Sequence, residues 1–182
     1  IPKLYGLMEE TADISALDEI GALRILDQEN LGANGKDIII GFVDTGIDYT
    51  LDVFKDDVGN SRIEAIWDQT DKTGIDSYAN FGRAAERICK GIWRRNGENP
   101  YSIVPERDDN GHGTMMASIA AGSFVDGFMG VAPKSNLLVV KLKETKQYLR
   151  DFFLVKDDVP AYEESDIMLA LRFLSDYATR LG

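Results

Sequence analysis

Two short motifs in this sequence contain the residue types that proton transfer requires. The first, at positions 43–48, reads Val-Asp-Thr-Gly-Ile-Asp and places Asp44 directly after an apolar run. The second, at positions 108–114, reads Asp-Asp-Asn-Gly-His-Gly-Thr and contains His112, the single histidine of the sequence. If Asp44 accepts a hydrogen bond from Nδ1 of His112, it fixes the tautomer that turns Nε2 toward a nucleophile. The pair is predicted to act as an orienting acid and a general base.

Each of the two residues also has a purely structural interpretation. Asp44 could simply cap the turn that follows it, and His112 could bond to backbone or water where a helix starts. The positive end of a helix dipole disfavours the imidazolium, whereas a nearby carboxylate favours it. Together these two influences suit a general base, so the catalytic interpretation depends on the two residues meeting in space.

The elements that must position the pair can be predicted from local patterns. The apolar run Ile38–Val43 is rich in β-branched residues and indicates a strand buried on both faces, ending at Asp44. Small residues predict a close-packed helix at Gly113–Ala121 that stops at Gly122, and Leu137–Leu142 is a second buried-strand candidate. This alternation indicates a parallel α/β sheet, in which functional groups gather at the carboxyl ends of the strands.

Weaker patterns predict the remaining elements. A helix with an apolar stripe is expected over Leu17–Leu26, a short strand over Ile63–Trp67, and another helix over 83–93. The segment 143–160 could be a short helix or a hairpin that covers a sheet edge. The last helix is expected to follow Ser165 as its N-cap, with an apolar stripe of Ile167, Leu171, Leu174, Ala178 and Leu181.

Composition bounds the class of protein. The chain has 182 residues, of which 44% are hydrophobic, so one domain with a core is expected. A net charge of −11 argues against a nucleic-acid partner. One cysteine and one histidine cannot build a Cys/His zinc site, and no apolar run approaches the roughly 20 residues of a membrane span. The first residue is Ile1 rather than methionine, which suggests an upstream segment has been removed.

The ordered combination of three motifs, at 44–48, 109–114 and 130–133 (Gly-Val-Ala-Pro), resembles the subtilisin-like serine proteases. Within that family the sequence resembles in particular the Csp-type subtilases of clostridia, which include germination proteases. The segments 61–63, 66–70, 102–105 and 165–168 add weaker support, and the stretch from 71 to 101 matches least.

The resemblance implies that Asp44 is the triad aspartate and His112 the triad histidine. It implies a three-layer parallel sheet with helices on both faces, present here incompletely. Residues 1–182 would be the N-terminal portion of a catalytic domain, with 1–30 as a linker or the end of a pro-segment. The triad serine would lie outside this chain, because none of its serines occurs in the family's Gly-Thr-Ser turn. These residues would therefore be inactive alone.

The resemblance also predicts the partners. The substrate would be a protein or peptide, and the missing C-terminal part of the catalytic domain would complete the fold; without it, an exposed strand would favour self-association. No cofactor is expected for catalysis, although a structural calcium at Asp126 is possible. An extracytoplasmic or spore-associated location is suggested by the resemblance alone. The segment 161–164 resembles the family's substrate-flanking strand or is a plain connector.

Three alternatives remain open from the sequence. The chain could belong to a pseudoprotease, a regulatory binding module of the same fold whose serine is substituted. The triplet Asp44-Thr45-Gly46 also occurs in aspartic proteases, but those need a second such carboxylate and no second Asp-Thr-Gly is present. Finally, Asp44 and His112 could belong to an α/β domain in which they never meet.

Overall fold

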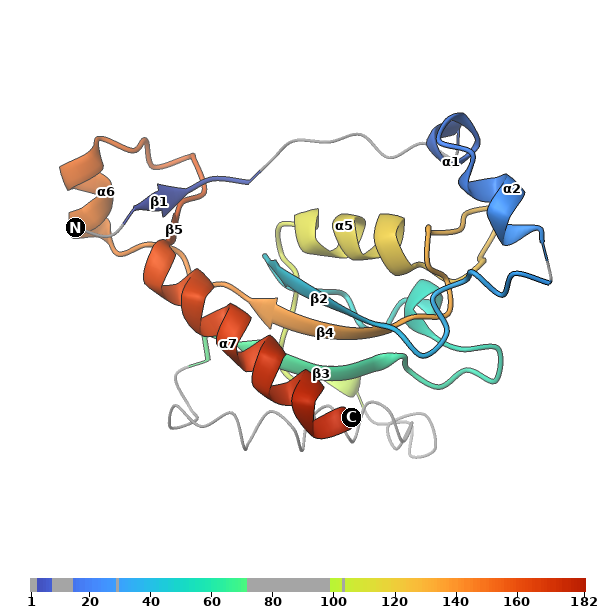
Figure 1. Ribbon diagram of the computed structural model, residues 1–182. Helices are drawn as coiled ribbons and strands as arrows, with labels where there is room; N and C mark the ends of the chain where they lie inside the picture. The colour runs from blue at the N-terminus through green and yellow to red at the C-terminus, as the bar shows by residue number, and fades with distance from the viewer. Residues whose placement is uncertain (1–2, 8–14, 29, 72–98, 103) are drawn as a thin grey trace.

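The structure is a computed structural model that describes residues 3–7, 15–28, 30–71, 99–102 and 104–182. The described elements follow one another along the chain as Figure 1 shows: β1 (Leu4–Tyr5), α1 (Ser15–Glu19), α2 (Ala22–Leu26), β2 (Ile39–Asp44), the 3-10 turn η1 (Asp52–Phe54), β3 (Ile63–Asp68), η2 (Pro100–Ser102), α5 (His112–Ala121), β4 (Asn136–Lys141), α6 (Gln147–Phe153), β5 (Tyr162–Glu163) and α7 (Glu164–Leu181). The predicted helix at 83–93 lies outside the described residues.

A three-stranded parallel sheet forms the centre of the described structure. Its strand order is β2-β4-β3, so β4 lies between the other two strands. Lys141 at the end of β4 is in register with both Asp44 of β2 and Asp68 of β3. The carboxyl ends of all three strands therefore meet at one edge of the sheet, which is where α/β proteins place their functional groups.

Helices cover both faces of this sheet, as the α/β pattern predicts. Successive side chains of a strand point to opposite faces. Leu137 and Val139 of β4 pack in the hydrophobic cluster that contains Ala117 of α5, whereas Leu138 and Val140 pack in the cluster that contains Phe173 of α7. The three-layer α/β architecture is thus confirmed, with α5 and α7 on opposite faces (Figure 1).

The strands differ slightly from their predicted limits. Strand β4 begins and ends one residue earlier than predicted. Strand β2 ends at Asp44 as predicted but begins at Ile39, and Ile38 lies outside it with 56% of its surface exposed. Strand β4 is buried on both faces as predicted for a central strand, while the residues of β2 are mostly half-buried. An apolar run does not reveal whether its strand is central or at the side of a sheet, and within the described residues β2 has only one neighbour.

The predicted helix over Leu17–Leu26 is wrong as a single element. It is divided into α1 and α2, because Gly21 adopts the left-handed conformation, with φ of 71°, and caps the second helix. Three-residue spacing of apolar residues is compatible with one helix or two, and glycine is the residue that takes this conformation most readily.

The last helix begins two residues earlier than predicted. Its N-cap is Glu163, which makes no side-chain capping bond, so Ser165 lies inside the first turn. The buried stripe also differs from the predicted one, since Leu171 and Leu181 are exposed. The fully buried residues of α7 are Asp166, Ala170, Phe173 and Tyr177. Three residues of the predicted stripe, Ile167, Leu174 and Ala178, pack beside them as partly buried residues. Phe173 packs against Trp67 of β3 and against Tyr177, so the centre of the buried face is aromatic.

The segment 143–160, left open between helix and hairpin, contains helix α6. The apolar residues expected to cover a sheet edge do not do so, because Phe152, Phe153 and Leu154 are exposed. The following segment forms β5, which pairs antiparallel with β1: Tyr5 is opposite Tyr162 and Leu4 is opposite Glu163.

A buried arginine connects three parts of the fold on the α5 side of the sheet. The guanidinium of Arg62 donates to the carbonyl oxygens of Val53 at 3.0 Å and Ala121 at 2.5 Å, and also to that of Ser135. Arg62 is buried, and Ala121 is the last residue of α5, where carbonyl groups favour a positive charge.

We expect Arg62→Met to lower the free energy of unfolding by about 3 to 5 kcal/mol, because it leaves several buried carbonyls without a donor. Urea unfolding of the 182-residue chain measures the change. The control is Arg172→Met, which removes an exposed ion pair with Asp176 and is expected to change stability by less than about 0.5 kcal/mol. A loss below about 1 kcal/mol for Arg62→Met would contradict the assigned role.

Candidate active site

Asp44 is held at the end of β2 by backbone bonds on both sides. Its carbonyl accepts the N–H of Leu142 at 2.8 Å, which continues the β2–β4 ladder, and its Oδ1 accepts the N–H of Thr45 at 2.7 Å. The carboxylate therefore leaves the sheet at a defined angle where the parallel strands end.

His112 is the first residue of α5, one residue before the predicted start of this helix at Gly113. The preceding Gly111 is the N-cap in the left-handed conformation, with φ of 85°, which lets the loop turn into the helix. The His112 N–H donates to Oδ1 of Asn110 at 3.2 Å. These local features place the imidazole at the N-terminal end of α5, next to the carboxyl ends of the strands.

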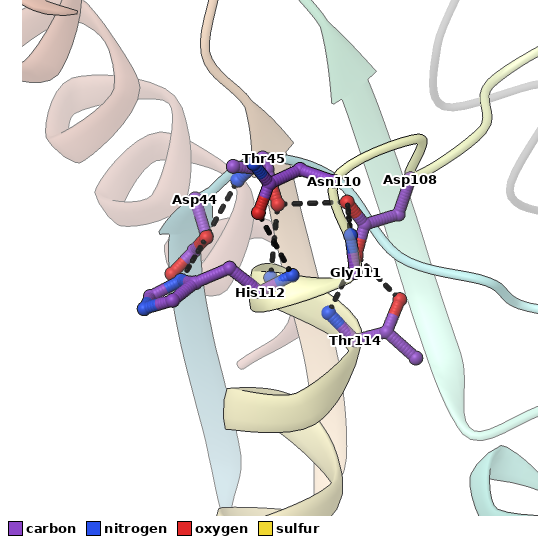
Figure 2. A network of polar contacts seen from close by, with 8 residues as sticks. Asp44, Thr45, Asp108, Asn110, Gly111, His112 and Thr114 are labelled. Carbon is purple, nitrogen blue, oxygen red and sulfur yellow. Dashed lines mark hydrogen bonds and ion pairs between the residues drawn. The ribbon is translucent and has the colours of Figure 1, made fainter. Parts of the chain in front are cut away.

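The structure brings the two predicted site residues together. Nδ1 of His112 lies 2.7 Å from Oδ1 of Asp44 (Figure 2), and their side chains are only 13% and 14% exposed. An ionised Asp44 accepts a hydrogen bond from Nδ1–H, which leaves the lone pair of the neutral ring on Nε2. The arrangement can therefore orient an imidazole and use it as a general base. The alternative in which the two residues never meet is wrong.

Close backbone contact between two glycines makes this meeting possible. A Cβ on Gly113 would collide with the carbonyl oxygen of Gly46, and it would also lie 3.2 Å from the Cβ of Asp44. Gly46 itself has φ of 127°, a conformation that other residues rarely adopt. The turn after β2 and the first turn of α5 therefore touch through main-chain atoms, and this contact sets His112 beside Asp44.

Asp108 holds the two motifs together through four hydrogen bonds. Its Oδ1 accepts from the hydroxyl of Thr45 at 2.7 Å and from the N–H of Gly111 at 2.9 Å, while its Oδ2 accepts from the N–H and the hydroxyl of Thr114 at 2.8 and 2.6 Å. The Thr45 hydroxyl in turn accepts the N–H of Gly113 at 2.9 Å. Figure 2 shows this network joining the end of β2 to the start of α5.

The network also keeps Asp108 ionised. Burial alone would raise the pKa of Asp108, but hydrogen bonds from Thr114, Thr45 and Gly111 stabilise the carboxylate and hold the pKa below its ordinary value. A carboxylate near the N-terminal end of α5 is also favoured by the helix dipole. The negative charge therefore caps the helix that carries His112.

Sequence reasoning missed Asp108, Thr45 and Thr114 as positioning residues, although all three lie inside the two motifs. The sequence feature that could have identified them is an acid or hydroxyl side chain within a few residues of Asp44 or His112. Asp126, suggested as a calcium ligand, is an exposed loop residue, and in the part of the chain that the structure describes no three His, Cys, Asp or Glu side chains gather as a metal site. None of the described helices is long and apolar enough to cross a membrane.

Comparison with known proteins gives the class that this fold and site define. The profile of the subtilase family matches residues 35–156, which is more than half of the chain and includes both motifs. The chain belongs to the subtilase family.

It is similar to the CspB protease of Clostridium perfringens, whose structure superimposes with a TM-score of 0.68 and 31% sequence identity, over 93% of this chain and 32% of that one. The predicted resemblance to Csp-type subtilases is thus confirmed. Subtilisin-like protease SBT3.6 of Arabidopsis thaliana is 26% identical over 88% of this chain and 22% of its own length. Subtilisin-like protease SBT3 of Solanum lycopersicum is 32% identical over 59% and 16%. The chain spans about a fifth of the length of these plant relatives.

Proposed function

We propose that Asp44 and His112 are the aspartate and histidine of a Ser/His/Asp triad in a serine endopeptidase whose nucleophile lies outside these 182 residues. The observation that carries the proposal is the 2.7 Å contact between Nδ1 of His112 and Oδ1 of Asp44, in a chain of the subtilase family. The substrates would be proteins or peptides.

In the proposed reaction, Nε2 of His112 takes the proton of the serine hydroxyl as the serine oxygen attacks the scissile carbonyl carbon. Asp44 accepts the Nδ1–H bond throughout and stabilises the imidazolium. The C–N bond then breaks, and the leaving amine receives the proton from His112. Water, deprotonated by the same base, hydrolyses the acyl-enzyme and restores the serine.

The residues described here would supply only part of this machinery. A base without a nucleophile has nothing to activate, and oxyanion donors aimed at the tetrahedral intermediate are also needed. The 182-residue chain is therefore expected to hydrolyse no peptide by itself, and its activity would require the remainder of the catalytic domain.

A serine-directed phosphonate probe tests the proposal. The full-length protein is expected to be labelled covalently at one serine, as mass spectrometry of the digested product would show. The 182-residue chain and a full-length His112→Ala variant are expected to stay unlabelled, because neither has both nucleophile and base. A folded full-length protein that resists labelling would overturn the proposal and favour the pseudoprotease alternative.

A further inference from the structure

Glu106 is a buried carboxyl group that the proposed proton transfers do not use. Its side chain is 1% exposed, although it lies in the charged loop before α5. Oε1 accepts the N–H of Ile47 at 3.1 Å, and a Cβ on Gly46 would collide with the same oxygen. The carboxyl group therefore lies in direct contact with the turn that begins at Asp44.

The surroundings of Glu106 do not favour a negative charge. Oε2 is buried and has no hydrogen-bond partner among the residues that the structure describes. The charged groups that act on it are Asp68 at the end of β3, Asp108 in its own loop and Lys141 at the end of β4. The ammonium group of Lys141 donates to the carbonyl of Arg107, so it also serves the backbone. Ionisation of Glu106 is therefore disfavoured by two neighbouring carboxylates and favoured by one ammonium group, which also bonds a backbone carbonyl.

The titration behaviour agrees with this geometry. Burial, helped by Asp68 and Asp108 and opposed by the Ile47 N–H and Lys141, raises the pKa of Glu106 to about 8. Tyr49, which also interacts with Glu106, is a buried phenol whose pKa is raised above its ordinary value mainly by burial, so it adds no charge at neutral pH. At pH 7 Glu106 therefore carries a proton.

We propose that Glu106 is a positioning residue: as a neutral carboxylic acid it supports the Asp44–Ile47 turn, and its ionisation at alkaline pH disturbs the pairing of Asp44 with His112. The link is short, because the Gly46 backbone lies between the Glu106 carboxyl group on one side and Gly113 on the other. As far as catalysis is concerned, this inference rests on the proposed function.

The sign of the pH dependence follows from the direction of the shift. The folded chain holds the Glu106 proton to a higher pH than the unfolded chain, whose ordinary value is 4.5. The contribution of this group to folding is therefore fully present below about pH 4.5 and is lost as the pH rises through about 8. Alkaline pH should weaken both the fold and the turn.

The test compares Glu106→Gln with wild type in the full-length protein. With a pKa of about 8, the protonated fraction of Glu106 falls about tenfold between pH 7 and pH 9. We expect kcat/KM of the wild type for a peptide substrate to fall about tenfold over this range, and that of Glu106→Gln to fall less than about twofold, because the amide does not ionise. An equal fall in both proteins would overturn the proposal.

Glu64→Gln is the matched control, since Glu64 is a half-buried glutamate of β3 whose pKa burial also raises, but it bonds Asn136 away from the site. It should keep the wild-type pH profile, and a flattened profile would overturn the assignment to Glu106.

A wild type that hydrolyses nothing would contradict the proposed function, not this inference. The ring ¹³Cε1 shift of His112 then decides: a second inflection near pH 8 that Glu106→Gln lacks supports the inference, and its absence from wild type overturns it.

If Glu106→Gln fails to fold, the wild type still provides a measurement. The side-chain ¹³Cδ resonance of Glu106, assigned through its backbone, should titrate with a midpoint near 8. A midpoint below about 6 would mean that Glu106 is already charged at neutral pH, and the proposal would be overturned.

Discussion

Asp44→Asn in the full-length protein is expected to lower kcat for peptide hydrolysis by about 10⁴-fold at pH 7. The amide nitrogen of asparagine can donate to Nδ1 of His112, so the ring would carry its proton on Nε2, where the base must be free to accept one. Oδ1 of Asp44 also accepts the Thr45 N–H at 2.7 Å, so an amide nitrogen at this position would face a second donor. An amide oxygen at this position would keep the tautomer but would lack the negative charge that stabilises the imidazolium, so either orientation weakens the base. His112→Ala, which removes the base, should cost at least as much.

Steady-state hydrolysis of a fluorogenic peptide measures this effect, and labelling by the phosphonate probe gives a second readout. Asp109→Asn is the matched control, because Asp109 is an exposed acid in the same motif as His112. Its expected effect on kcat is less than about twofold. A loss below tenfold for Asp44→Asn, with normal folding, would show that Asp44 does not orient the base.

Gly113→Ala is expected to destabilise the chain by at least about 2 kcal/mol, although alanine is the better helix former by about 1 kcal/mol. The added methyl group would collide with the carbonyl oxygen of Gly46, and both partners belong to the backbone, so neither can move cheaply. The collision would push the start of α5 away from the end of β2, and His112 away from Asp44.

Gly111→Ala separates this collision from ordinary backbone strain. Gly111 has φ of 85° but open space around its Cβ position, so alanine there should cost only the left-handed penalty of about 1 to 2 kcal/mol. Urea unfolding of the two variants provides the comparison. A Gly113→Ala protein as stable as wild type would show that the two motifs do not touch as described.

The central elements and the pair of site residues could be predicted because their signals are local. A β-branched run ending in Asp44 and a small-residue helix beginning at His112 are defined by neighbours in sequence, and parallel strands bring such ends to one edge of a sheet. The same local signals did not reveal the break at Gly21, because an apolar stripe with three-residue spacing fits one helix or two.

Local patterns determined which segments form strands and helices, and hence that an acid and an imidazole stand at the same edge. The tertiary structure alone decided that Phe173 and Tyr177 rather than Leu171 face the sheet, that Asp108 joins the two motifs, and that Glu106, which reads as part of a charged loop, is buried beneath the turn after Asp44. The reason is physical. Periodicity depends on adjacent residues, whereas burial and the partners of a charge depend on which distant segment packs against it.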